Sequence, residues 1–199
     1  MKKILLAATL LATPAAALAQ TVADPNPAHV KPGTYQVESS HTRILFAVSH
    51  MGFTTWYGNF TGATGTLNLN PAKLAATSFT ITIPANSVST TNTVLDKELN
   101  SPEWFDTAKY PTITFKSEKV ARTGQDTAEV TGELTFHGVT RPETLDVTFN
   151  AGGVNPISKQ YTIGFNATGT LMRSDFNQST YVPLIGDKVT LIISAAFVQ

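Results

Sequence analysis

Apolar and polar residues alternate along most of this chain from Tyr35 onward. An alternation with a period of two is typical of a β-strand that turns one face to a core and the other to water. Turn-forming pairs such as Asn70-Pro71 and His137-Gly138 separate the runs. The apolar positions are Ile44, Phe46 and Val48; Leu67 and Leu69; Phe79, Ile81 and Ile83; Ile113 and Phe115; Val130, Leu134 and Phe136; Leu145, Val147 and Phe149; Tyr161, Ile163 and Phe165; and Val189, Leu191 and Ile193.

This pattern predicts an all-β domain of about eight antiparallel strands joined mostly by short connections. Such a chain removes its unpaired edges by closing into a barrel or by forming a sandwich. Short connections between successive strands favour an up-and-down barrel. A barrel of about eight strands has room for a filled core or for one bound ligand.

Residues 91–106, TNTVLDKELNSPEWFD, interrupt the β pattern. Leu95 and Leu99 are four residues apart, with polar residues between them, so this stretch predicts a short amphipathic helix. A helix inserted between the strands of a small barrel covers one opening. We expect it to cap the core, and the alternative is a gate for a hydrophobic ligand.

The first 19 residues, MKKILLAATLLATPAAALA, form a secretory signal peptide with a charged start, an apolar centre and small residues before the cleavage point. The apolar run is too short to span a bilayer. Residues 20–33 hold three prolines and predict an extended tether, which leaves residues 34–199 as one barrel domain. The chain has no cysteine, and therefore neither a disulfide nor a lipidated anchor. We expect the protein in the periplasm.

The composition argues against several classes of function. Basic and acidic residues number 14 each and form no basic run, so the electrostatic signature of nucleic-acid binding is missing. The sequence contains no HExxH, no GxSxG, no glycine-rich phosphate loop and no cysteine nucleophile. We therefore predict no catalytic residue, no metal ligand and no cofactor.

His41 and His50 stand at the two ends of one strand-like run. On a continuous strand, nine residues separate two side chains by about 30 Å and place them on opposite faces. They cannot share one zinc ion, whose bonds to imidazole are about 2 Å long. His50 follows the apolar parity of its run. It is either a hydrogen-bonded core residue, which we favour, or a contact for a ligand head group.

Arg173 continues the apolar parity of the run that begins at Tyr161, and Asp175 follows at the same parity. Burying an unpaired guanidinium costs several kcal/mol, so Arg173 needs a partner. One interpretation is an ion pair with Asp175 or another acid. The other is a partly satisfied arginine at a cavity mouth that binds an anionic head group through charge-assisted hydrogen bonds.

Six segments carry a family resemblance over most of the chain. They are YQVESSHTRILFAVSHMG at 35–52, GNFTGATGTL at 58–67, DKELNSPEWFD at 96–106, YPTITFKSEKV at 110–120, GELTFHGVTRPETLDV at 132–147 and MRSDFN at 172–177. In this order they resemble the YceI-like family of periplasmic, lipocalin-like polyisoprenoid-binding proteins. Asn177 departs from the glycine that often follows Arg-Ser-Asp-Phe in that family.

The resemblance implies an extended eight-stranded barrel with helical segments that holds a long isoprenoid, or a related lipid with a phosphate or quinone-type head, in an internal tunnel. It also implies roles in isoprenoid handling and stress response, no stable membrane insertion, and pairing of two copies. The predicted ligand-binding residues are Ile44, Phe46, Val48, His50, Phe79, Ile81, Ile83, Phe115, Leu134, Phe136, Ile163, Phe165 and Arg173.

His50 and Arg173 are the predicted head-group contacts. Two alternatives to a lipid carrier remain open from the sequence. One is an interaction module whose barrel is filled by its own aromatic side chains. The other is an enzyme that acts on a lipid head group with a histidine as general base.

Overall fold

The computed structural model describes residues 22–199, so the predicted signal peptide lies outside the described residues. The strands are β1 (Gly33–Val37), β2 (Arg43–His50), β3 (Thr54–Phe60), β4 (Thr64–Leu69), β5 (Ser78–Pro84), β6 (Thr112–Arg122), β7 (Thr127–Phe136), β8 (Val139–Val154), β9 (Tyr161–Met172) and β10 (Ile185–Val198). The helices are α1 (Thr93–Leu99) and four short 3-10 turns, η1 (Pro27–His29), η2 (Leu74–Ala76), η3 (Ala85–Ser87) and η4 (Arg173–Phe176).

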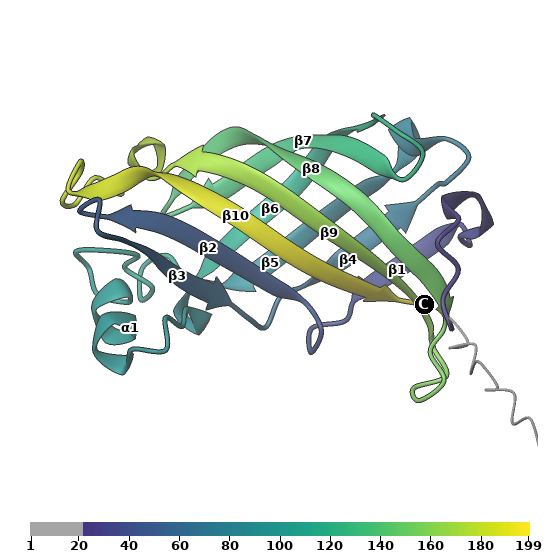
Figure 1. Ribbon diagram of the computed structural model, residues 1–199, viewed down its shortest axis with the longest axis horizontal. Coiled ribbons are helices and arrows are strands. Elements are labelled where there is room, and N and C mark those ends of the chain that lie inside the picture. The colour runs from purple at the N-terminus through teal and green to yellow at the C-terminus, as the bar shows by residue number, and fades with distance from the viewer. Residues whose placement is uncertain (1–21) are drawn as a thin grey trace, which may run out of the picture.

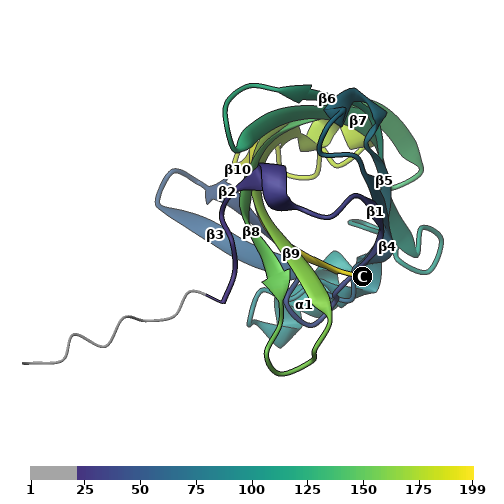
Figure 2. The same ribbon diagram turned by 90° about the vertical axis from the view of Figure 1, so that its right-hand side faces the viewer.

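Eight of the ten strands close into an antiparallel barrel. Their order around the barrel is β1-β4-β5-β6-β7-β8-β9-β10, and β10 pairs back with β1. That closing seam is short, with Gln36 opposite Val198 and Val37 opposite Phe197. Figure 1 shows the strands running obliquely between the two ends of the molecule, and Figure 2 shows them arranged in a ring. The predicted eight-stranded antiparallel barrel with a short helical insertion is confirmed.

The other two strands form a hairpin that extends the wall at one end. The first part of β10 pairs with β2, from Val189 opposite Val48 to Ser194 opposite Arg43, and β2 pairs with β3. Beyond β3 the wall is continued by the segment that contains η3 and α1. There the backbones of Asn59 and Ser89 exchange two hydrogen bonds of 2.8 and 2.9 Å. The alternation in the sequence did not reveal this extension.

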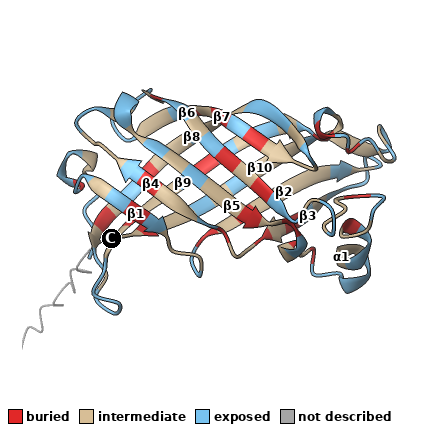
Figure 3. Ribbon diagram, turned by 180° about the vertical axis from the view of Figure 1, so that it is seen from behind, coloured by how far each residue is buried: buried red, intermediate tan, exposed pale blue. Residues whose placement is uncertain are grey.

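The alternating apolar positions face the inside of the barrel, and Figure 3 shows buried and exposed positions following one another along its strands. They form two clusters. The larger cluster includes Phe60, Leu99, Trp104 and Phe176 and lies toward α1. The smaller cluster lies at the opposite end and includes Val30, Tyr35, Phe149, Ile163 and Phe197.

The described part of the predicted tether, from residue 22 onward, packs against the barrel. Asp24 pairs with Gly152 of β8, and Val30 is 7% exposed within the smaller cluster. The Tyr35 hydroxyl donates a hydrogen bond to the Lys31 carbonyl at 2.6 Å. Burial raises the pKa of Tyr35 to about 12, and Tyr161 adds to this rise. The structure differs from an extended tether because Val30 covers apolar surface that the strands leave open.

Helix α1 is shorter than the stretch that predicted it. The Asn92 side chain accepts hydrogen bonds from the backbone of Val94 and Leu95, which caps the helix start. The chain then folds through residues 100–110 and packs Trp104 and Phe105 against the end of the barrel. In Figure 1 this helix lies at one end of the barrel, and the C terminus and the N-terminal segment lie at the other.

Candidate functional site

The barrel encloses a cavity of about 350 Å³ that is lined almost entirely by carbon. This volume falls in the range of small-molecule binding pockets. Many of its inward-facing side chains, including Phe46, Phe79, Val147 and Leu191, are only partly buried. These side chains remain partly accessible, which means that the side chains of the barrel do not fill its interior completely.

Eleven of the thirteen predicted ligand-binding residues line this cavity. They are Ile44, Phe46, Val48, Phe79, Ile81, Ile83, Phe115, Leu134, Phe136, Phe165 and Arg173. The strand parity therefore places these side chains together in space. Their contact with a ligand stays a prediction.

The structure places the other two residues, Ile163 and His50, outside the lining. Ile163 is fully buried, because Val30 and Tyr35 of the N-terminal part pack over it. His50 lies at the end of β2, on the hairpin that extends past the barrel, with its ring 5.4 Å from that of Trp56.

One end of the cavity, called here the open mouth, reaches solvent-exposed residues. Arg122, Gln125 and Asp126 of the β6–β7 turn line it and are exposed, together with the half-buried Pro27 and Pro71. Figure 2 looks at this end, where the N-terminal segment crosses part of the opening of the ring of strands. Water therefore reaches any group that a ligand places here.

The opposite end, called here the closed end, is formed by Leu99, Trp104, Phe105, Arg173 and Gln178. All of these are buried except Phe105, which is half-buried. The Phe105 ring lies 6.0 Å from that of Phe60 and 5.2 Å from that of Phe136. The segment after α1 therefore occupies the position that the cap interpretation requires, and a gating movement stays untested.

The Arg173 guanidinium lies at the closed end, and four backbone carbonyls satisfy it. Nε donates to Gly186 O at 2.8 Å, Nη1 to Gln178 O, and Nη2 to both Thr180 O and Ile185 O at 2.9 Å. Burial lowers the pKa of this guanidinium, and the nearby Asp187 carboxylate opposes that effect.

This geometry differs from both sequence interpretations of Arg173. Within residues 22–199 it forms no ion pair with Asp175 or any other acid. The guanidinium also has few donors left to bind an anion, since four of its five N–H groups already have acceptors. The reason is local: β9 ends at Met172, and the loop after η4 folds around the arginine. Asn177 has φ 60° there, in the left-handed region that glycine and asparagine tolerate.

The sequence did not single out the polar side chains that line the cavity other than Arg173, and among these Gln178 and Glu143 are not exposed. Gln178 is 3% exposed, and its Nε2 donates to Trp104 O at 2.9 Å. Glu143 shares the parity of Leu145 and Val147 on β8, which could have identified it as inward-facing. Burial raises the pKa of the Glu143 carboxyl, and repulsion from Asp175 adds to the rise.

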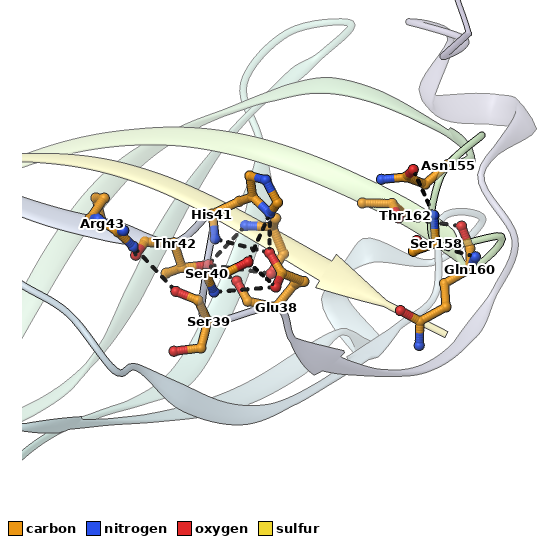
Figure 4. Close-up of polar contacts among 11 residues, drawn as sticks. Glu38, Ser39, Ser40, His41, Thr42, Arg43, Asn155, Ser158, Gln160 and Thr162 are labelled. Carbon is orange, nitrogen blue, oxygen red and sulfur yellow. Dashed lines mark hydrogen bonds and ion pairs between the residues drawn. The ribbon is translucent and has the colours of Figure 1, made fainter.

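His41 belongs to a tight polar turn between β1 and β2 (Figure 4). The Glu38 carboxylate accepts hydrogen bonds from the Ser40 hydroxyl, the Ser40 and His41 amides and the His41 ring. These bonds lower the pKa of Glu38 to about 2, with the Ser40 hydroxyl contributing most. The Ser40 hydroxyl donates to the Glu38 carboxylate. It also contacts His41 Nδ1, the same ring nitrogen that contacts the carboxylate. This is a turn-stabilising cluster, because a catalytic serine needs the second ring nitrogen as its base.

Residues 22–199 contain no group of three or more histidine, aspartate or glutamate side chains placed to hold a metal ion. Within the same residues, every helix is too short or too polar to cross a membrane.

Comparisons with known proteins agree with the barrel fold. The profile of the YceI-like domain matches residues 35–197. Protein YceI of Escherichia coli O6:H1 is 37% identical over 162 residues, which cover 81% of this chain and 84% of that protein.

Two solved structures share the fold. BcnA of Burkholderia cenocepacia has a TM-score of 0.70 at 24% identity, covering 78% of this chain and 95% of BcnA. A polyisoprenoid binding domain from Saccharophagus degradans, implicated in plant cell wall breakdown, has a TM-score of 0.61 at 15% identity and covers 84% and 99% of the two chains. The family profile spans most of the barrel, and the relative from E. coli matches over a similar length. The chain therefore belongs to the YceI-like family.

Proposed function

We propose that this protein binds one long isoprenoid, or a related amphiphilic lipid, in its internal cavity and carries it without changing it chemically. The observation behind this proposal is the lining: an interior of carbon atoms whose side chains remain partly accessible. An empty apolar space of this kind lacks the contacts that a hydrocarbon chain supplies. A polar substrate would find almost no hydrogen-bonding partner along the walls.

The expected affinity follows from burial of the chain. Each buried CH₂ contributes roughly 0.8 kcal/mol, so a five-carbon isoprene unit contributes on the order of 3 kcal/mol before ordering costs. A few units therefore suffice for tight binding, and the walls cannot distinguish one hydrocarbon chain from another. Selectivity must come from the length of the cavity and from the polar groups at its ends.

Family membership supports this assignment. The S. degradans protein with the same fold is a polyisoprenoid binding domain, and we extend that ligand class to this chain. The N-terminal sequence supports export to the periplasm by a cleavable signal peptide. A filled-barrel interaction module is less compatible with the cavity of about 350 Å³.

The test is native mass spectrometry of the mature protein purified from a periplasm without detergent, followed by extraction and identification of the lipid. We expect one lipid per chain. As a matched pair, Ala167→Phe places a ring in the cavity, whereas Thr168→Phe places one on the exposed face of the same strand. The first variant should lose the lipid and the second should keep it. A protein that is bare and also binds no added polyprenol or quinone would exclude the carrier function.

A further inference from the structure

The two ends of the cavity treat a lipid head group differently. At the open mouth, the exposed Arg122, Gln125 and Asp126 leave a head group in contact with water. A group that stays hydrated is selected only weakly, because water can replace each protein contact. At the closed end, Trp104, Arg173 and Gln178 are buried, so a head group there exchanges water for protein. Strong discrimination can arise only at the closed end.

The polar atoms of the closed end are mostly engaged already. Four carbonyls occupy four of the five N–H groups of Arg173. The Gln178 amide nitrogen donates to the carbonyls of Trp104 and Asn177. Few donors therefore remain to bind a phosphate, which needs several of them.

Two acceptors remain without a partner. Within residues 22–199, no side chain or backbone group donates a hydrogen bond to Gln178 Oε1 or to the Glu143 carboxyl, and both residues line the cavity. Arg141, two residues before Glu143 on β8, donates from Nε to Asp175 O of η4 at 3.4 Å, so this part of β8 lies at the closed end. Gln178 is 97% buried, so the oxygen belongs to a side chain that is almost entirely removed from bulk water. A hydrocarbon terminus would leave these acceptors unpaired, and an anion would be repelled by them.

We propose that the closed end binds the uncharged, hydrogen-bond-donating head group of the lipid, an alcohol, with Gln178 Oε1 and the Glu143 carboxyl as its acceptors. This inference rests on the proposed lipid-binding function and specifies its substrate class. It also sets the orientation of the ligand: the head lies beside Trp104, and the chain runs toward the open mouth.

The test compares four ligands with one carbon skeleton: geranylgeraniol, its methyl ether, its monophosphate and the parent hydrocarbon. Binding is followed through the fluorescence of Trp104, with Trp56 replaced by phenylalanine. Loss of one hydrogen bond predicts that the alcohol binds the wild-type barrel about tenfold more tightly than the ether. The monophosphate should bind more weakly than the alcohol.

Two glutamines at opposite ends form a matched pair of variants. Gln178→Met should reduce the preference for alcohol over ether to about one, while the affinity for the hydrocarbon is kept. Gln125→Met, at the open mouth, should leave the preference unchanged. Because Gln178→Met also removes the bond to Trp104 O and can impair folding, Glu143→Gln and the wild-type ligand series provide independent measurements.

Three results would overturn the inference: equal binding of alcohol and ether, tighter binding of the monophosphate, or loss of the preference in Gln125→Met instead of Gln178→Met. Each of these leaves the carrier function standing. If none of the four ligands binds, the proposed function itself fails. The two failures are therefore distinguishable.

Discussion

The two ends of this barrel bound the same cavity in different ways, one open to solvent and one closed. At the open mouth, short β-turns and the docked N-terminal segment surround an entrance with exposed polar residues. At the closed end, residues 100–110 and the loop after η4 pack aromatic rings and a buried arginine across the barrel. The strands thus supply a uniform apolar wall, and the irregular segments between them determine which end can recognise a head group.

The largest difference between the two ends is expected when the arginine of each end is replaced. Arg173→Met leaves four carbonyls without their donor, so we expect a loss of about 3 kcal/mol or more in the free energy of unfolding, measured by urea denaturation. Arg122→Met, at the open mouth, should change it by less than about 0.5 kcal/mol. Arg173→Lys should lie between them, because it keeps the charge but not the fork of donors. Equal losses at the two ends would contradict the asymmetry.

A second prediction tests whether the two ends belong to one continuous cavity. Ala167→Phe places a ring in the middle of the barrel, and we expect lipid binding to weaken at least about tenfold. Stability should fall by about 1–3 kcal/mol, because Ala167 is buried and its neighbours must shift to admit a larger side chain. Thr168→Phe is the control on the exposed face. Binding titrations and thermal unfolding of both variants provide the check, and unchanged binding in Ala167→Phe would mean that the ligand occupies one end only.

A third prediction uses a carboxyl that belongs to neither end. The folded-state pKa of Glu38 is about 2, below its usual value of 4.5. Its contribution to stability is therefore fully present above pH 4.5 and is lost as the pH falls through about 2. Glu38→Gln should cost about 1 kcal/mol at pH 7, as for the loss of a capping side chain. The difference from the wild type should shrink in unfolding measurements toward pH 2.

The smallest change in stability is expected at Glu143, and the dependence of stability on pH has the opposite sign to that at Glu38. Because burial raises the pKa of this carboxyl, the folded state holds its proton at pH values where the unfolded state has lost it. Stability therefore falls as the pH rises from 4.5 through the raised value. Glu143→Gln should stabilise the apo-protein at pH 7 by less than about 1 kcal/mol. Asp126→Asn, an exposed carboxyl at the mouth, is the control; a larger gain there would argue against burial as the cause.

The sequence predicted the walls well, because alternation directly reports which face of a strand a side chain occupies. Ile44, Phe46 and Val48 of β2 and Phe79, Ile81 and Ile83 of β5 all point inward for that reason. The same rule places Glu143 on the inward face of β8, because it shares the parity of Leu145 and Val147.

The ends could not be predicted in the same way. The parity that led to Arg173 stops at Met172, where the chain leaves the strand and forms η4. Two acceptors of the arginine, Gln178 O and Thr180 O, lie on a loop whose path depends on tertiary contacts and not on local periodicity, and the other two lie at the start of β10. Ile163 has the parity of a lining residue, yet Val30 covers it, because a segment expected to be an extended tether docks on that end. Irregular segments carry no repeat from which their position can be calculated.

The short seam between β1 and β10 has a consequence for the life of the nascent chain. Gln36 meets Val198 there, so the barrel closes through contacts between the first and the last strand. Contacts between residues so distant in the sequence slow folding, because the entropy lost in closing a long loop opposes their formation. Until synthesis reaches residue 198, the apolar inner faces of the earlier strands have no complete enclosure. A chaperone that shields these faces during synthesis would protect this protein at the stage when it is most prone to aggregate.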